Sequence, residues 1–341
     1  MATMQDVARQ AGVSIATVSF VLNGTKAVTE PTRKRVEAAM AELGYRRNPA
    51  GSALARGRTD IIALLYPALQ RQLHATATRF FTSAAERAQE RGFSLVMWPA
   101  ANEAHEIDEL TRSGLIDGVL LMEVQLEDER VEALRKGTTP FALIGRTQDP
   151  TGLPYVDIDF EQTVVSGIEE LVARGHTNIA FLYDHSGPST LHAYGAIARA
   201  SRTFRDTIAQ SGLSGVTVDC GETPRAGREV GEMFREKHPD VTAVLIMNEL
   251  ASPGFMTGLR QAGTLVPDEL SVLSLVSSDT VASMCDPELA FMRAPAEELG
   301  RLGTDAVIDR ITKPDSALPH RLVPCQMVPG SSVGPTSAVG D

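Results

Sequence analysis

Small polar side chains recur along one short stretch near the start of the chain, "GVSIATVSFVLNG" at residues 12–24. If this stretch is helical, hydroxyl and amide groups lie along one side of it. Such groups suit the phosphate oxygens of a nucleic acid, which position a bound protein but carry no sequence information. The polar residues are Ser14, Thr17, Ser19 and Asn23.

Other kinds of chemistry find little support in the sequence. His185 and His192 have no third metal ligand nearby, and neither phosphate-binding glycine motif of nucleotide enzymes is present. The three cysteines lie far apart without a C-x-x-C pair, which favours small core residues in a reduced compartment. His176 follows a helix and a glycine, where packing or capping is expected. We therefore predict no catalytic residue, no metal, no cofactor and no enzymatic activity. The cysteines are Cys220, Cys285 and Cys325.

Charge is distributed unevenly along the 341 residues. Residues 1–58 hold nine Lys and Arg against four Asp and Glu, a net charge of +5, whereas the remaining 23 basic and 39 acidic residues give −16. A small basic segment on an acidic body predicts that only this segment meets a polyanion. Among its basic residues, Arg33, Lys34 and Arg35 are equally consistent with a phosphate contact and with a solvated helix face.

The polar stretch requires helices to position it. Apolar residues at helical spacing predict one helix over residues 4–11 and a second over 14–23, with Ser14 as its N-cap and Val18, Val21 and Leu22 facing inward. Gly12 supplies the left-handed residue that a tight turn between them needs. Two helices joined by a three-residue turn form a helix-turn-helix, whose second helix enters the major groove of DNA. A three-helix bundle with plain polar faces is the alternative.

A third helix is expected directly after Thr29, Glu30 and Pro31, which supply a cap and first-turn residues. Its buried face is predicted from its apolar spacing, and Gly44 ends it. The predicted buried residues are Val36, Met40 and Leu43.

The pattern changes after Arg58. Apolar runs alternate with amphipathic helices from residue 61 to 144, and the rhythm resumes over 155–276. Such alternation predicts parallel α/β sheets. Two similar lobes in one chain imply a cleft between them, where small molecules usually bind.

Two long motifs resemble the LacI/GalR family of bacterial transcriptional repressors: residues 5–24, "QDVARQAGVSIATVSFVLNG", and residues 28–36, "VTEPTRKRV", which lead into "LGYRRNP" at 43–49. Later segments, "RGHTNIAFL" at 174–182 and "VPDELSV" at 266–272, look like the effector-binding region of that family. The resemblance implies two DNA-binding heads in a dimer, a two-lobed core like periplasmic binding proteins, and a small effector in the cleft.

The resemblance also implies where DNA is contacted. Base contacts fall on Ile15, Ala16 and Phe20, where apolar groups reach only thymine methyls or exclude water. Residues 47–59 correspond to the hinge of the family, with Asn48 as a helix cap and Leu54 as an apolar wedge for the minor groove; a flexible linker is the alternative. The predicted DNA-binding residues are Thr3, Ser14, Ile15, Ala16, Thr17, Ser19, Phe20, Asn23, Thr29, Tyr45, Asn48 and Leu54.

The effector site departs from the pattern implied by family members that bind sugars. Ala200 stands at the position of their helix arginine, although Arg199 is adjacent; Glu249 replaces an Asp after Asn248, and Val276 replaces another Asp. We therefore expect a smaller or less polar effector than a free sugar, held chiefly by Asn248, or a core that has lost ligand control. The candidate effector-binding residues are Arg146, Asp159, Arg199, Asn248 and Val276.

The sequence thus predicts an α/β protein with an N-terminal helix-turn-helix. Its domains are a DNA-binding domain at 1–46, a hinge at 47–59, a core at 60–330 and a flexible tail at 331–341, with lobe one at about 60–160 and 291–319 and lobe two at about 161–290 and 320–330. We expect a cytoplasmic regulator that binds double-stranded operator DNA and a small effector, as a homodimer or higher oligomer without membrane contact. A cytoplasmic small-molecule-binding module without ligand-controlled DNA release, a transporter-linked solute-binding module and an α/β enzyme are the alternatives, and the effector acts either as inducer or as corepressor.

Overall fold

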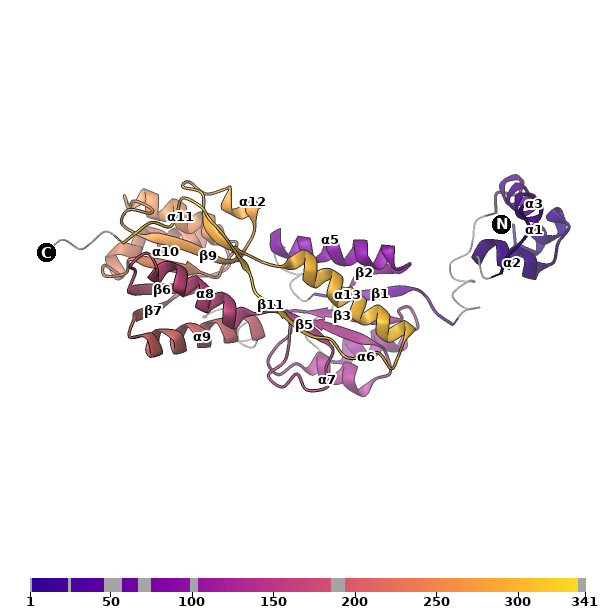
Figure 1. The fold of residues 1–341 in the computed structure, drawn as a ribbon, viewed down its shortest axis with the longest axis horizontal. Helices are drawn as coiled ribbons and strands as arrows, with labels where there is room; N and C mark the ends of the chain where they lie inside the picture. The colour runs from indigo at the N-terminus through magenta and orange to yellow at the C-terminus, as the bar shows by residue number, and fades with distance from the viewer. Residues whose placement is uncertain are drawn as a thin grey trace. The chain divides into compact units, whose positions relative to one another are not determined.

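The computed structural model describes residues 2–23, 26–45, 57–66, 75–98, 104–184 and 194–336. The chain divides into two compact units, residues 1–59 and 60–341 (Figure 1). Over its described residues the first unit contains helices and no strand, and the second contains two α/β lobes, so the predicted fold class is confirmed.

The first unit is a small helical bundle. Val7, Val18 and Val36, one from each helix, are fully buried at its centre. Ala39 is buried where Leu43 was expected, because Leu43 lies just beyond the end of the third helix and its side chain is 37% exposed. The helices are α1 (Met4–Ala11), α2 (Ile15–Asn23) and α3 (Glu30–Glu42).

Lobe one of the second unit is a parallel sheet between two helical layers. The strand order is β11-β5-β4-β3-β1-β2. Alternate residues of β1 show why both faces need cover: Ile62 and Leu64 pack toward α5, whereas Ala63 and Leu65 pack toward α6 and α7. The strands are β1 (Ile61–Leu65), β2 (Ser94–Trp98), β3 (Gly118–Met122), β4 (Phe141–Ile144), β5 (Tyr155–Ile158) and β11 (His320–Val323). The helices are α5 (Ala75–Glu90), α6 (Ala104–Arg112), α7 (Glu129–Lys136) and α13 (Ala296–Thr312).

Lobe two repeats this plan with strand order β12-β10-β9-β8-β6-β7. Helices α8 and α9 lie along one face of the sheet and α10 and α11 along the other (Figure 1). Only β12 runs antiparallel to its neighbour. The strands are β6 (Asn178–Tyr183), β7 (Ser214–Asp219), β8 (Ala243–Ile246), β9 (Ser271–Ser277), β10 (Ala290–Arg293) and β12 (Gln326–Val328). The helices are α8 (Phe160–Val172), α9 (Gly195–Ser211), α10 (Pro224–Lys237), α11 (Ser252–Gln261) and the short α12 (Asp279–Ala282).

The chain passes between the lobes three times: after β5, after β10, and between β11 and β12. The predicted lobe boundaries are therefore wrong near the C-terminus. Strand β10 belongs to lobe two, and residues 320–323 belong to lobe one, where β11 pairs in parallel with β5. Strands β11 and β12 are both short edge strands. Their sequences do not show to which sheet each belongs, and only their pairing partners distinguish them.

The predicted flexible tail also needs correction over residues 331–336. Ser332 is fully buried, and its hydroxyl donates to the Val272 carbonyl at 2.6 Å. The Thr336 amide donates to the Arg174 carbonyl at 2.9 Å. The ring of His176 bridges this segment to the core, with Nε2 3.1 Å from the Gly334 carbonyl, which confirms its packing role. These contacts were invisible in the sequence because small polar residues resemble a loose tail; residues 337–341 lie outside the described chain.

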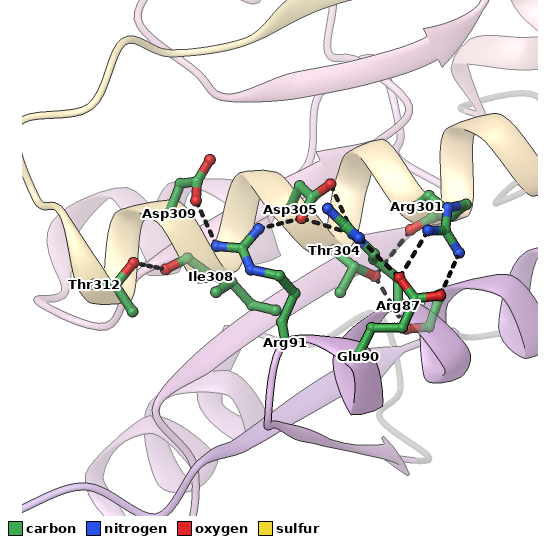
Figure 2. A network of polar contacts seen from close by, with 11 residues as sticks. Arg87, Glu90, Arg91, Arg301, Thr304, Asp305, Ile308, Asp309 and Thr312 are labelled. Carbon is green, nitrogen blue, oxygen red and sulfur yellow. Dashed lines mark hydrogen bonds and ion pairs between the residues drawn. The ribbon is translucent and has the colours of Figure 1, made fainter. Parts of the chain in front are cut away.

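An ion-pair network joins α5 to α13, two helices more than two hundred residues apart in the sequence (Figure 2). The Asp305 carboxylate accepts hydrogen bonds from Arg87, at 2.9 Å, and from Arg91. Glu90 accepts from Arg301 and Arg87, each at 2.8 Å, and these bonds hold the pKa of Glu90 at about 2. The network fixes the helix that enters lobe one after the second crossing.

Glycines allow α10 and α11 to pack backbone to backbone in lobe two. A Cβ at Gly258 of α11 would overlap with the Arg228 carbonyl of α10, and a Cβ at Gly231 would overlap with the Phe255 carbonyl. Neither carbonyl can move without distorting its helix, so larger side chains are excluded from this crossing.

We predict that Gly258→Ala destabilises the chain by about 1–3 kcal/mol, the usual result of overfilling a packed contact. The loss is expected although alanine is the better helix former by about 1 kcal/mol. Denaturant unfolding followed by far-UV circular dichroism measures it. Gly137→Ala is the matched control, because a Cβ there makes only ordinary contacts, 3.6 Å from the Ala133 and Leu134 carbonyl oxygens. Equal stability of both variants would contradict the packing argument.

Candidate functional site

The N-terminus of α2 is built as the sequence predicts. The Ser14 hydroxyl accepts a hydrogen bond from the Thr17 amide at 3.1 Å and lies 2.9 Å from the Thr17 hydroxyl. Thr3 caps α1 in the same way, since its hydroxyl accepts from the Asp6 amide at 3.3 Å. Ser14 and Thr3 are both exposed at the starts of their helices, although the Thr3 amide itself donates to the Asp6 carboxylate at 3.0 Å.

The three predicted base-contacting residues lie on α2, with Ile15 and Ala16 in its first turn and Phe20 one turn after Ala16. Ile15 is 46% exposed, Ala16 is exposed, and Phe20 is half-buried. The Lys26 ammonium lies 5.7 Å from the centre of the Phe20 ring, within cation–π range. This surface therefore presents apolar groups with one cation beside them, and among these three side chains no hydrogen-bond donor is available to read a base edge.

The other predicted DNA-binding residues fall into two groups. Thr29 is exposed, with its hydroxyl 3.0 Å from that of Thr32, while Ser19 is half-buried and Tyr45 packs half-buried against the bundle core. The side chain of Asn23 and the hinge residues Asn48 and Leu54 lie outside the described part of the chain.

A cavity of about 240 Å³ lies between the two lobes of the second unit. Its walls are mainly apolar and aromatic, as is usual for small-molecule sites. Lobe one contributes Tyr66, Phe80 and Glu123, and lobe two contributes Tyr194 and Glu222. Four of the five predicted effector residues also line it, namely Arg146, Arg199, Asn248 and Val276.

Buried charges are concentrated at one side of this cavity. Arg146 contacts the Asp157 carboxylate at 3.3 Å and the Glu161 carboxylate at 2.7 Å. Arg199 of α9, only 4% exposed, donates through Nη2 to the carbonyls of Arg146 and Thr147 at 3.0 and 2.8 Å. These bonds join lobe two directly to a loop of lobe one.

Burial shifts the pKa values of both ends of this cluster. The pKa of Asp157 rises to about 7 because burial penalises its charged form, an effect that Arg146 and Arg199 only partly offset. The pKa of Arg199 falls, first because of burial and then because of the like charge of Arg146. In the folded chain, burial therefore disfavours the charged forms of both Asp157 and Arg199, and neighbouring groups of opposite charge partly restore them.

A second contact bridges the lobes elsewhere in the cavity wall. Glu249, buried in lobe two, accepts from the Thr76 amide and hydroxyl of lobe one at 3.2 and 3.0 Å. It also accepts from Ser278 at 2.6 Å. Tyr66 faces the same cavity, and its pKa is raised first by burial and then by Glu123. The two lobes are thus bridged at the cavity by hydrogen bonds that any separation of the lobes must break.

Two cavity residues have unfavourable backbone conformations. Val276 has φ 52° and Glu123 has φ 50°, in the left-handed region that non-glycine residues rarely occupy. Each such residue costs about 1–3 kcal/mol and is found mostly at functional sites. The strain supports assigning function to the cavity.

Two of the predicted effector residues have structural roles instead. Asn248 lines the cavity, but its amide donates to the Cys220 carbonyl at 2.8 Å and its side-chain oxygen accepts from the Ala251 amide at 3.1 Å. Asp159 is not among the lining residues; it caps α8 by accepting from the Gln162 amide at 2.9 Å. A short polar side chain beside a helix start satisfies the backbone first, which the sequence pattern did not reveal.

Sequence reasoning missed the acidic part of the site. Asp157, Glu123 and Glu222 all line the cavity, yet none was proposed. Asp157 offered a usable signal, because a carboxylate between Val156 and Ile158 interrupts an otherwise buried strand. Glu123 and Glu222 offered none, since each follows a strand like many solvated acids.

Further chemistry was sought over the described residues. Within them no group of three or more His, Cys, Asp or Glu side chains is placed to hold a metal ion. The three cysteines are buried free thiols, as predicted, and burial raises the pKa of each to about 12. Of the helices described, none has the length and apolarity to cross a membrane.

Comparison with known families matches both units. Residues 3–48 match the family described as "Bacterial regulatory proteins, lacI family", and residues 168–333 match "Periplasmic binding protein-like domain". The HTH-type transcriptional regulator CelR of Thermobifida fusca is 30% identical over 333 residues, which cover 94% of this chain and 95% of that protein.

Solved structures agree with this result. A complex of the transcriptional regulator CelR with cellobiose is 25% identical, covers 97% of this chain and 100% of its own, and has a TM-score of 0.69. The lac repressor dimer bound to operator and the anti-inducer ONPF covers 98% of this chain and 99% of its own at a TM-score of 0.82, and with 22% identity it shows the same fold.

We predict that Asp157→Asn removes a pH dependence of stability between about pH 4 and 7. Asp157 keeps its proton to about pH 7 in the folded chain, whereas an unfolded aspartate loses it near pH 4. The wild-type chain should therefore lose stability relative to the variant as pH rises through this window, by up to about 4 kcal/mol.

Urea unfolding monitored by the fluorescence of Trp98, the single tryptophan, reports on lobe one. Asp108→Asn, at an exposed carboxylate of α6, is the control. If the wild-type and Asp157→Asn stabilities stay parallel from pH 4 to 8, Asp157 is not the titrating group.

Proposed function

Since the chain belongs to the lacI family of bacterial regulatory proteins and is a DNA-binding transcriptional regulator, we propose that it is a repressor whose affinity for operator DNA is controlled by a small effector in the cavity between its lobes. The observation that carries this proposal is the cavity itself, whose two walls belong to different lobes and are joined by Arg199 and Glu249. A ligand in this cavity shifts the equilibrium between two arrangements of the lobes. The size of the shift is set by the difference in the ligand's affinity for the two arrangements.

The mechanism we propose couples that change to the DNA-binding unit of a homodimer. Two identical helix-turn-helix units match two half-sites only at one spacing, so a change in the cores alters operator affinity. The relatives support each partner: CelR has been solved with cellobiose, and the lac repressor as a dimer on operator DNA. By this proposal the chain is a cytoplasmic protein and not an enzyme. In the cavity wall Arg146 pairs with Asp157, and Glu249 bonds to Thr76 and Ser278, so these groups are engaged within the protein rather than presented as a nucleophile and base.

Retention of the full chain on duplex DNA at rising salt tests the proposal. Affinity should fall steeply with salt, because the basic first unit gains much of its binding energy from phosphates. Absence of salt-dependent retention would leave only a small-molecule-binding module, and retention that no cavity ligand alters would contradict effector control.

We predict that the natural protein does not require guanine at the base pairs faced by the predicted base-contacting residues of α2. Ile15, Ala16 and Phe20 carry no hydrogen-bonding groups there, whereas Phe20→Arg supplies a fork that pairs with guanine. Selection of bound sequences from random duplexes should show a new guanine in each half-site for Phe20→Arg, with discrimination of about 1–3 kcal/mol. Phe20→Ala, which removes the ring without adding a donor, should gain none. A strict guanine selected by the wild type would refute this reading.

We also predict that free mono- and disaccharides, cellobiose included, bind at best weakly. Sugar hydroxyls need polar partners, and each one left unpaired in a buried site costs about 1–3 kcal/mol. Val276 offers no partner, while Asn248 and Glu249 already bond within the protein. Calorimetry of the full chain against a sugar panel is the measurement. Micromolar binding of any sugar would mean that the lobes rearrange to free these groups.

A further inference from the structure

The cavity between the lobes carries more negative than positive charge. Among the described residues that line it, four are acids and two are basic, Arg146 and Arg199. Arg146 is paired with Asp157 and, at 2.7 Å, with Glu161 behind the cavity wall. Even with Asp157 protonated, Glu161 and the remaining three acids outnumber the two arginines. Those three acids are Glu123, Glu222 and Glu249.

Glu249 has no counter-charge among its partners in the described chain. The residue is 6% exposed, and its carboxylate accepts from the Thr76 amide and hydroxyl and from the Ser278 hydroxyl. All three donors are neutral. A buried carboxylate is normally paired with a cation, because burial removes the water that stabilises its charge. A carboxylate has about four acceptor positions, so three donors leave one unused beside the cavity.

Aromatic rings line the same cavity. The face of an aromatic ring attracts a cation, and the attraction is strongest where water is excluded. Burial raises the pKa of Tyr66, and the negative charges of Glu123 and Glu222 raise it further, so both acids lie near this ring. Rings and carboxylates therefore act on the same space. The rings are those of Tyr66, Phe80, Phe160 and Tyr194, all buried.

The size and lining of the cavity favour a small organic cation over a metal ion. Over the residues that the structure describes, no group of three or more His, Cys, Asp or Glu is placed to hold a metal ion. Much of the wall is apolar, and it gains by contact with apolar groups of a ligand rather than with a hydrated ion. Its volume of about 240 Å³ lies below the roughly 300–1,000 Å³ of ordinary ligand pockets.

We infer that this cavity binds a small organic cation, an ammonium group on an apolar body. The charge pairs with Glu249 and with the acids near Tyr66, and the apolar groups contact the aromatic rings. That this cation acts as the effector rests on the proposed function, whereas the cation site itself does not. The cation would contact the carboxylate that joins the lobes through Thr76, so its binding acts on the interlobe contact itself.

Two kinds of ammonium group fit this site. An alkylated ammonium places methyl groups against the rings, whereas a primary ammonium donates hydrogen bonds to the carboxylates. Calorimetric titration of the full chain without DNA, at an ionic strength held constant with sodium chloride, tests both. Choline is compared with its neutral isostere, in which a tert-butyl group replaces the trimethylammonium group, and butylammonium is compared with butanol.

Two variants each remove one cavity charge and keep the size of the side chain, Glu249→Gln and Glu222→Gln. Glu249→Gln loses its hydrogen bond from the Thr76 amide, and if it does not fold, Glu222→Gln decides, because Glu222 is half-buried and its change is better tolerated. Glu236→Gln is the matched control, at an exposed acid of α10 that does not line the cavity.

At least one ammonium ion should bind the wild type and Glu236→Gln equally, and about tenfold or more tightly than its neutral counterpart. The cavity variants should bind it about tenfold more weakly, the equivalent of one lost charge-assisted bond. Affinity that is the same in every variant would mean general attraction to an acidic protein, and it overturns the inference. A wild type that prefers neither ammonium ion to its neutral counterpart also overturns it.

The order of the two affinities identifies the kind of ammonium group. Tighter binding of choline supports recognition by the rings, and tighter binding of butylammonium supports recognition by the carboxylates. Effector control is read separately, from retention on duplex DNA with and without the bound ammonium ion at equal salt. An ammonium ion that binds and leaves retention unchanged supports the cation site and counts against effector control. If neither ammonium ion binds while another cavity ligand alters retention, the cation site is wrong and the proposed function stands.

Discussion

The core depends on a buried arginine that is held across the junction of the two lobes. Arg199 comes from lobe two, yet its Nη2 bonds to carbonyls of lobe one and its nearest carboxylates are shared with Arg146. A guanidinium that cannot lose its charge must find partners or stay in water. Because those partners belong to the other lobe, separation of the lobes would remove the hydrogen bonds of the guanidinium. The charge cluster therefore opposes separation of the lobes.

The chain connects the two lobes at three crossings. Each crossing lies next to an edge or end of a sheet rather than within a helix. Helix α13 returns to lobe one after the second crossing and is held on α5 by the carboxylate of Asp305 between two arginines (Figure 2). Each lobe is thus packed by itself, and the hydrogen bonds that bridge the lobes around the cavity are the contacts that a separation of the lobes would break.

The cavity combines features that bias it toward ligand control. Strained backbone at Val276 and Glu123, a protonatable Asp157, and the Glu249 contact to Thr76 all lie on its walls. Strained or buried polar groups of this kind make the empty site less stable than the same site with a ligand bound. A ligand that pairs with them therefore stabilises the lobe arrangement to which it binds. The first unit is built differently: its small core packs apolar side chains from all three helices.

The sequence by itself determined the elements and their type. Helical spacing located α1 and α2, Ser14 located the start of α2, and alternating apolar runs indicated the parallel sheets, because these patterns are local consequences of burial on one helix face or both sheet faces. The family motifs indicated the function by resemblance.

Tertiary structure decided the features for which local patterns were ambiguous. Strand β11 belongs to lobe one because it pairs with β5, and residues 331–336 pack on the core through the buried Ser332. It decided the site as well, since only proximity shows that Asn248 bonds to backbone while Asp157 meets Arg146. Hydrogen-bond partners distant in the chain leave no period in the sequence, so these roles could be read only from the fold.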